Sequence, residues 1–172
     1  YSLKKIIDEG YEIPLVVTQP DRRGNRNKMI LSPVKEMALE HGLEVAQPYR
    51  IKDDAEFVAG LKEIAPDMIV VAAFGQILSQ EILDIPAYGC LNIHASLLPK
   101  YRGASPIQHA IIDGEAETGV TIQQMNIGID TGDILYKKVI AIDPKDTYES
   151  LFEKLTVLGG EAIVETLELL EE

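Results

Sequence analysis

Apolar residues follow two periods along this chain, and segments of the two kinds alternate. Short apolar runs bounded by Gly, Pro or Asp are typical of buried strands, and apolar positions every three or four residues are typical of helices. Strands are predicted at Ile13–Thr18, Leu43–Ala46, Met68–Phe74, Gly89–His94, Val120–Met125 and Ile134–Ile142. Helices are predicted up to Gly10, from Ser32-Pro33 to near Gly42, from Asp53 or Asp54 to Ile64, at Ser79–Leu83, at Ala104–Ile112 and from Thr147 to about Leu170.

The alternation covers the first two-thirds of the chain and predicts an α/β fold with a mostly parallel sheet. Right-handed crossover connections would place helices on both faces of that sheet. The 172 residues are enough for one domain with a substantial core. The segment Gln19–Ser32 is polar and basic, and we expect a surface loop there.

Composition excludes several classes of protein. The longest apolar run, Met68–Phe74, is too short to cross a bilayer, so no membrane partner is expected. The one cysteine, Cys90, cannot form an internal disulfide and stands among apolar residues, which is typical of a buried thiol in a reducing compartment. We therefore expect a cytoplasmic protein. The formal net charge of −12 argues against general nucleic-acid affinity.

The charges are unevenly distributed along the chain. Five cations and no acid fall between Arg22 and Lys35, whereas five Glu and no base fall between Glu161 and Glu172. The acidic stretch is typical of a solvated helix face. The basic stretch is compatible both with a plain surface loop and with a site that contacts phosphates, and charge alone leaves both open.

The candidate chemistry begins at the end of a predicted strand. Asn92 and His94 are two residues apart there, so their side chains share one face of the sheet. Ligands of open α/β sheets bind beyond the carboxyl ends of the strands. Asp130 follows in a loop that we expect to fold back onto them. Taken singly, Asn92 or His94 is also compatible with a purely structural role, in which the side chain forms hydrogen bonds with backbone groups at the strand end.

The three side chains together indicate acyl transfer. An amide polarises a carbonyl, an imidazole moves protons, and a carboxylate holds the imidazole. No group of His, Cys and Asp has the spacing of metal ligands, and no Gly-rich turn matches a dinucleotide or P-loop signature. We therefore expect no metal, NAD or ATP site.

Several ordered segments carry a family resemblance. Asn92–Gln108 reads NIHASLLPKYRGASPIQ, and Gly119–Leu135 reads GVTIQQMNIGIDTGDIL. Upstream, Val17–Arg23 reads VTQPDRR, Ser32–Lys35 reads SPVK and Val70–Leu78 reads VVAAFGQIL. Together they resemble the folate-dependent formyltransferase family over nearly the whole chain. The resemblance implies a Rossmann-like, three-layer αβα fold with a mostly parallel sheet.

The resemblance also implies the site and its donor. It implies Asn92, His94 and Asp130 as the catalytic residues, 10-formyltetrahydrofolate as the formyl donor, and no metal. Arg102 is expected to form a structural ion pair or to touch folate or acceptor. Folate is expected to contact Phe74, Gly75, Gln76, Ile77 and Leu78, then Ser96, Leu97, Leu98 and Pro99, and finally Asn126, Ile127 and Gly128.

Members of the family differ in their acceptor, which is methionyl-tRNA, glycinamide ribonucleotide, an amino sugar or, in hydrolases, water. The segment RRGNRNK followed by SPVK resembles a loop that tRNA-acting members insert near the acceptor arm. We therefore expect formylation of initiator methionyl-tRNA for translation initiation. The expected tRNA contacts are Arg22, Arg23, Arg26, Lys28 and Lys35.

The alternatives are transfer to glycinamide ribonucleotide or to a nucleotide amino sugar, and hydrolysis of formyltetrahydrofolate. A non-catalytic folate- or nucleotide-binding module is disfavoured because Asn92, His94 and Asp130 are all present. Family members also carry an initial strand before the first helix and a C-terminal β-barrel domain that binds tRNA. We therefore expect residues 1–172 to be a single, monomeric catalytic domain, truncated at its N-terminus and lacking that barrel.

Overall fold

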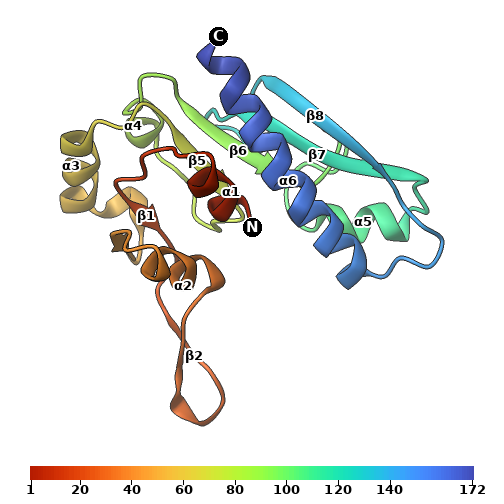
Figure 1. Ribbon diagram of the computed structural model, residues 1–172, viewed down its shortest axis with the longest axis horizontal. Coiled ribbons are helices and arrows are strands. Elements are labelled where there is room, and N and C mark those ends of the chain that lie inside the picture. The colour runs from red at the N-terminus through yellow and green to blue at the C-terminus, as the bar shows by residue number, and fades with distance from the viewer.

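The computed structural model describes residues 1–172 and has six α-helices and eight strands (Figure 1). The helices are α1 (Ser2–Asp8), α2 (Pro33–Glu40), α3 (Ala55–Ile64), α4 (Gln80–Leu83), α5 (Pro106–Ile112) and α6 (Tyr148–Glu171), with short 3-10 turns η1 (Asn25–Asn27) and η2 (Ile51–Asp53). The strands are β1 (Val16–Val17), β2 (Arg22–Arg23), β3 (Met29–Ile30), β4 (Val45–Ala46), β5 (Ile69–Ala72), β6 (Cys90–His94), β7 (Glu117–Gln124) and β8 (Ile134–Ala141).

Local capping chemistry explains where the predicted helices begin. The Ser32 hydroxyl accepts a hydrogen bond from the Lys35 amide at 3.1 Å, and Pro33 occupies the first helical position of α2. The Asp54 carboxylate caps α3 through the Phe57 amide at 2.9 Å. Side-chain oxygens at these positions satisfy amides that have no partner inside the helix.

The main sheet has the strand order β5-β6-β7-β8. Strands β5 and β6 are parallel, whereas β6–β7 and β7–β8 are antiparallel. A separate parallel pair is formed by β1 and β4. The α/β class and the parallel pairing of the early strands are confirmed. The sheet then continues in antiparallel pairs, because β7 returns beside β6 after α5 and the loop 125–133 turns directly into β8.

Helices cover both faces of the sheet. Helix α6 crosses β6, β7 and β8 on one face, with α1 beside it (Figure 1), and buries Leu91 and Ile122 against Leu155 and Ile163. Helices α3 and α4 pack on the other face. That second core consists of Ile51, Val58, Leu61, Leu78, Ile82, Leu83 and Cys90.

The neighbouring strand residues Cys90 and Leu91 therefore belong to opposite cores, as the two-residue period of a strand requires. Burial raises the pKa of the Cys90 thiol to about 11, so it stays protonated at neutral pH. The prediction of a buried thiol is confirmed.

The segment predicted as a loop from Gln19 to Ser32 contains a short hairpin, so that prediction was incomplete. Strands β2 and β3 pair with Arg22 opposite Ile30 and Arg23 opposite Met29, and the hairpin projects from the body (Figure 1). A Cβ at Gly24 would lie 2.1 Å from Cδ1 of Ile30, so a larger residue there would displace the Ile30 side chain. Strands of two residues are too short to show a period, which is why the pattern missed them.

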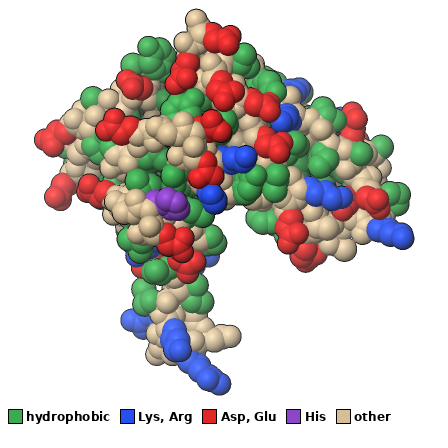
Figure 2. Space-filling model, in the orientation of Figure 1, with side chains coloured by type: hydrophobic (Ala, Val, Ile, Leu, Met, Phe, Trp, Pro, Cys, Tyr) green, Lys and Arg blue, Asp and Glu red, His purple; other side chains and the backbone are tan.

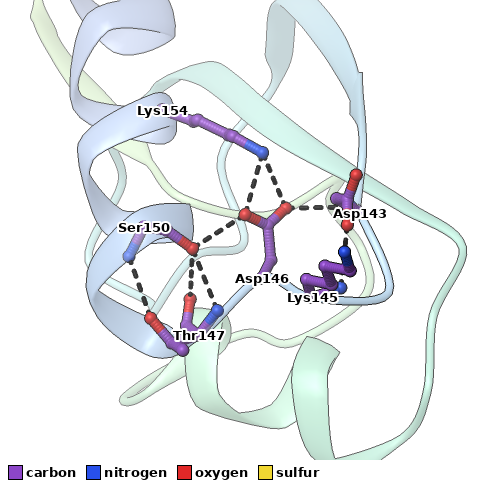
Figure 3. A network of polar contacts seen from close by, with 6 residues as sticks. All are labelled: Asp143, Lys145, Asp146, Thr147, Ser150 and Lys154. Carbon is purple, nitrogen blue, oxygen red and sulfur yellow. Dashed lines mark hydrogen bonds and ion pairs between the residues drawn. The ribbon is translucent and has the colours of Figure 1, made fainter.

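A polar network closes the N-terminal end of α6 (Figure 3). Asp146 accepts hydrogen bonds from Lys154 Nζ at 2.8 Å, from Ser150 Oγ at 2.7 Å and from the Asp143 amide at 2.9 Å. Thr147 and Ser150 form a reciprocal capping box. The side chain of Asp146 is only 5% exposed, so one carboxylate ties the loop before α6 to the first turns of the helix.

We expect Asp146→Asn to lower the melting temperature, with an effect that depends on pH. Hydrogen bonds from Lys154 above all, then Ser150 and Asp143, lower the pKa of Asp146 from 3.8 to about 2. A lowered pKa in the folded state stabilises the fold above the unfolded pKa, and this stabilisation is lost as the pH falls toward the folded value. Thermal unfolding should therefore separate wild type and variant most above pH 5 and least near pH 2.

Asp53→Asn is the matched control, since the Asp53 side chain is 56% exposed and pairs only with Arg50 on the surface. It should change the melting temperature little at any pH. A difference between Asp146→Asn and wild type that stayed constant from neutral pH to pH 2 would contradict the assignment of the effect to the carboxylate charge.

Candidate active site

Strand β6 places the predicted pair on one face of the sheet. Asn92 and His94 alternate with Leu91 and Ile93, whose side chains pack in the core under α6. The next strand sets its own polar residues opposite them, because Gln123 of β7 pairs with Asn92 and Thr121 pairs with His94. The prediction that Asn92 and His94 share a face is confirmed.

His94 is held with a defined arrangement of hydrogens. The side chain is buried, with 7% of the residue exposed, and Nε2 lies 2.8 Å from the carbonyl oxygen of Tyr101. A carbonyl only accepts hydrogen bonds, so Nε2 carries the hydrogen. Nδ1 is therefore the nitrogen that can gain and lose a proton. It lies 3.5 Å from Oδ2 of Asp130.

Asp130 reaches His94 from a loop that starts at the other end of β6. The amide of Met125 donates to the Cys90 carbonyl at 2.8 Å, and the loop 125–133 then folds back along the sheet. Three groups fix Asp130: Gln123 Nε2 donates to Oδ1 at 2.8 Å, the Gly103 amide donates to Oδ2 at 2.7 Å, and Arg102 Nε donates to the backbone carbonyl at 3.0 Å. The predicted return of this loop onto His94 is confirmed.

Sequence reasoning missed several residues that hold the pair. Gln123 and the backbones of Tyr101 and Gly103 were not among the predicted site residues. A signal for Gln123 was present, because Thr121 and Gln123 repeat at the strand period inside an otherwise apolar run. Arg102 bonds to a backbone carbonyl, and the structure shows no salt bridge for it, so the expectation of a structural ion pair was wrong.

Left-handed backbone conformations gather around this site. Among non-glycine residues, φ is +47° at Ala73, +58° at Tyr101, +62° at Ser105 and +51° at Asp130. Such conformations are unfavourable for L-residues and persist where surrounding contacts impose them, often at functional sites. The loops that follow β5, β6 and β7 each contain at least one of these residues.

In the predicted folate loop after β5, some side chains are bonded or buried within the protein and others are exposed to a ligand. Leu78 is buried in the core, and the Gln76 side chain bonds to Gln19, to the Pro48 carbonyl and to the Ile51 amide. Phe74 is half-buried, whereas Gly75 and Ile77 are exposed, Ile77 by 66%. The loop therefore offers an exposed apolar side chain at the carboxyl edge of the sheet beside His94.

The other two predicted folate segments divide in the same way. Ser96 and Leu98 are buried; the Ser96 hydroxyl donates to the Lys100 carbonyl, and the Leu98 amide donates to Thr121. Leu97 is half-buried and Pro99 is exposed. Asn126, Ile127 and Gly128 are all exposed, and Asn126 Oδ1 orders its loop by accepting from Gly128 and Thr131. Contacts from these residues to folate stay a prediction.

Four of the five predicted tRNA contacts gather on the hairpin. Arg22, Arg23, Arg26 and Lys28, here called the hairpin cations, are all exposed, and Figure 2 shows positive side chains at the end of the projecting hairpin. Lys35 is separate from them. Its Nζ lies 2.6 Å from Asp21 and 2.8 Å from Gln47 Oε1, and its side chain is 16% exposed. Lys35 holds the base of the hairpin, and its positive charge is paired with the carboxylate of Asp21.

Two surface hollows lie elsewhere, near α3 and α4, and both are lined by Lys62 and Glu81. These two side chains form an exposed ion pair at 2.6 Å, and neither hollow includes a predicted site residue. No group of three or more His, Cys, Asp or Glu side chains is arranged to hold a metal ion. No helix combines the length and the apolar character needed to span a bilayer.

Comparison with known families classifies the chain. A family model described as formyl transferase matches residues 3–167. The chain belongs to the formyl transferase family. The match covers β6, the His94–Asp130 pair and most of α6, so every element described here as part of the site lies within it.

Relatives of this formyl transferase chain include proteins named methionyl-tRNA formyltransferase. The protein of that name from Caldanaerobacter subterraneus subsp. tengcongensis is 55% identical over 172 residues, which cover 99% of this chain and 56% of the relative. The one from Chromobacterium violaceum is 54% identical over 167 residues, covering 96% of this chain and 54% of the relative. The chain thus spans about half the length of these relatives.

Solved formyl transferases share the fold. Phosphoribosylglycinamide formyltransferase from Bacillus halodurans superposes with a TM-score of 0.82 at 28% identity, over 98% of this chain and 89% of that one. A sugar N-formyltransferase from a Shewanella species gives a TM-score of 0.61 at 29% identity, over 80% of this chain and 50% of that one. The Rossmann-like α/β architecture predicted from the sequence is confirmed.

Proposed function

We propose that this chain carries the catalytic site of an enzyme that transfers the formyl group of 10-formyltetrahydrofolate to the α-amino group of initiator methionyl-tRNA. The observation that carries the proposal is the His94–Asp130 pair, with Nδ1 and Oδ2 3.5 Å apart. Asn92 lies on the same face of β6, in a chain of the formyl transferase family. An amide donor, a proton carrier and a carboxylate are the groups that formyl transfer requires.

The residues around the pair fit a folate donor. Ile77, Ile127 and Ile129 expose between 64% and 68% of their surface in the loops that follow β5 and β7. Contact with a flat heterocycle would remove these apolar side chains from water, which is favourable. Gly75, with φ of +80°, permits a close approach to the backbone. When bound, 10-formyltetrahydrofolate supplies the formyl carbon and the nitrogen that leaves.

Asn92 would stabilise the formyl oxygen, and His94 would carry the proton. The Asn92 amide donates to the formyl oxygen as negative charge develops on it, a contribution of about 3 kcal/mol for a well-placed donor. His94 Nδ1 accepts the proton released by the attacking amine and returns it to the leaving nitrogen. Asp130, 3.5 Å away, stabilises the imidazolium that exists between these two events. Nε2 keeps its hydrogen throughout and donates it to the Tyr101 carbonyl.

Two observations favour a tRNA acceptor. The hairpin cations are exposed and unopposed on a projecting segment, which suits contacts to a phosphate backbone. The named methionyl-tRNA formyltransferases are also 54–55% identical to this chain, against 28% for a phosphoribosylglycinamide formyltransferase. Glycinamide ribonucleotide is the second candidate acceptor, because the solved structure of that name covers 98% of this chain with a TM-score of 0.82.

A competition assay with the full-length protein tests the proposal. Charged initiator methionyl-tRNA, glycinamide ribonucleotide and a nucleotide amino sugar would be offered together with labelled 10-formyltetrahydrofolate. We expect labelled formyl on the methionine of the tRNA. Label on a small acceptor, or free formate alone, would remove the tRNA assignment while keeping formyl chemistry. No label on any product would remove the catalytic assignment.

Replacing the hairpin cations with Ser is expected to lower kcat/KM for methionyl-tRNA at least about 100-fold at moderate salt, chiefly through KM. Each lost phosphate contact should also reduce the slope of log(kcat/KM) against log[salt] by about 1. Steady-state kinetics at several salt concentrations measures both. The matched control replaces four exposed lysines outside the hairpin: Lys4, Lys52, Lys62 and Lys145. Equal losses in the two variants would show that only overall charge matters.

A further inference from the structure

Three consecutive residues contact both members of the His94–Asp130 pair. They are Tyr101, Arg102 and Gly103, here called the strap. The Tyr101 carbonyl accepts from His94 Nε2 at 2.8 Å. The Gly103 amide donates to Asp130 Oδ2 at 2.7 Å, and Arg102 Nε donates to the Asp130 carbonyl at 3.0 Å. A displacement of the strap would therefore disturb both side chains at once.

The strap has a backbone conformation that needs support. Tyr101 has φ of +58° and Gly103 has φ of +82°. Glycine adopts this region freely, but a bulky aromatic residue rarely does, because its Cβ crowds the backbone. The left-handed turn at Tyr101 directs its carbonyl to His94, so some other contact has to keep Tyr101 in this unfavourable conformation.

The phenol of Tyr101 makes such contacts. Its hydroxyl lies 2.7 Å from Asp113 Oδ2 and 2.9 Å from Glu115 Oε1, and it donates its one hydrogen to one of them at a time. Lys100 Nζ, 2.9 Å from the same Glu115 oxygen, balances the charge. The ring also stacks on His109, with centroids 6.2 Å apart and planes inclined by 9°. Asp113 and Glu115 directly follow α5, so the phenol ties the strap to the end of that helix.

We propose that Tyr101 is a positioning residue whose phenol, held by Asp113 and Glu115, keeps the strap in contact with His94 and Asp130. The hydroxyl stays a donor, because its hydrogen bond to Asp113, burial and the bond to Glu115 raise the pKa of Tyr101 well above its usual value. The role in catalysis rests on the proposed function, whereas the arrangement of hydrogens on His94 does not.

The test uses Tyr101→Phe in the full-length protein, because this change keeps the ring and removes only the hydroxyl. In ¹⁵N NMR spectra at a pH where His94 is neutral, the wild type should show the hydrogen on Nε2, and the variant should show a mixture of the two tautomers. Formyl transfer should fall about tenfold in kcat, the usual effect of losing one hydrogen bond to a charged group, with KM changed less than about twofold.

Tyr88→Phe is the matched control, since Tyr88 is 66% exposed and lies before β6, at the end of the strand away from His94. It should leave both the spectrum and kcat unchanged. A second set of variants, Asp113→Ala with Glu115→Ala, removes both acceptors of the phenol and should reproduce the loss in kcat. Adding Tyr101→Phe to that pair should then cost little more, because the same contact is already broken.

The outcomes separate the two proposals. Wild-type tautomer and wild-type kcat in folded Tyr101→Phe would overturn the positioning role. A tautomer change in a protein with no formyl transferase activity would support the positioning role and remove the proposed function. A loss of kcat that only follows the loss of folded protein in thermal unfolding, with His94 unchanged in the folded fraction, would reduce Tyr101 to a stabilising residue and overturn the inference.

Discussion

His94→Gln is expected to lower kcat for formyl transfer by about 10²–10⁴-fold, the range for losing a positioned proton carrier. A Gln amide can still donate to the Tyr101 carbonyl, which receives Nε2 of His94 at 2.8 Å in the wild type. It has no counterpart to Nδ1 beside Asp130. The fold should therefore persist while the proton has no carrier between the attacking and leaving nitrogens.

Single-turnover formyl transfer measures this effect apart from binding, and circular dichroism with thermal unfolding establishes that the variant is folded. The control is His41→Gln, because His41 is exposed and follows α2, where its Nδ1 lies near the Met37 carbonyl. It should keep wild-type kcat. A folded His94→Gln protein whose kcat stayed within about twofold of wild type would exclude His94 as the proton carrier.

Gly132→Ala is expected to damage both stability and activity. A Cβ at Gly132 would lie 1.6 Å from the Gln124 carbonyl oxygen, which is backbone and cannot rotate away. Overpacking of this kind costs about 1–3 kcal/mol and sometimes more. The loop 125–133 would have to shift, and Asp130 with it. A displacement of about 1 Å in a catalytic group is enough to lower kcat about 100-fold.

The matched control is Gly60→Ala in α3, where a Cβ would meet nothing within 4 Å. Alanine favours a helix over glycine by about 1 kcal/mol, so this variant should melt at the wild-type temperature or slightly above it. Urea unfolding and steady-state kinetics compare the two. Wild-type stability and kcat in Gly132→Ala would show that the loop tolerates a rearrangement that leaves Asp130 in place.

The positions that sequence reasoning predicted well depend on local chemistry. Helix starts were predicted at Ser32 and at Asp53 or Asp54, and Ser32 and Asp54 each cap a helix within three residues. Asn92 and His94 were predicted on one face because a strand alternates sides at every residue. These relations act over a few residues, so any fold that contains the segment reproduces them.

Contacts between distant segments were harder to predict. Lys35 was grouped with the hairpin cations by its place in the sequence, but it pairs with Asp21 and Gln47 across the base of the hairpin. Gln123 was not included, although it holds Asp130. The strand period marks Gln123 as a polar position, but neither its contact with Asp130 nor the pairing of Lys35 follows from a period or a motif, because each contact depends on how two elements pack.

The sequence by itself determined the α/β class, the helix starts, the shared face of Asn92 and His94, and the family to which this chain belongs. Only the tertiary structure decided that β7 and β8 extend the sheet in antiparallel pairs and that Gln123 and Gly103 hold Asp130 beside His94. It also decided that the carbonyl of a left-handed Tyr101 sets the hydrogen on Nε2. Almost every residue has the same backbone amide and carbonyl, so a sequence does not show which partners these groups find in the folded chain.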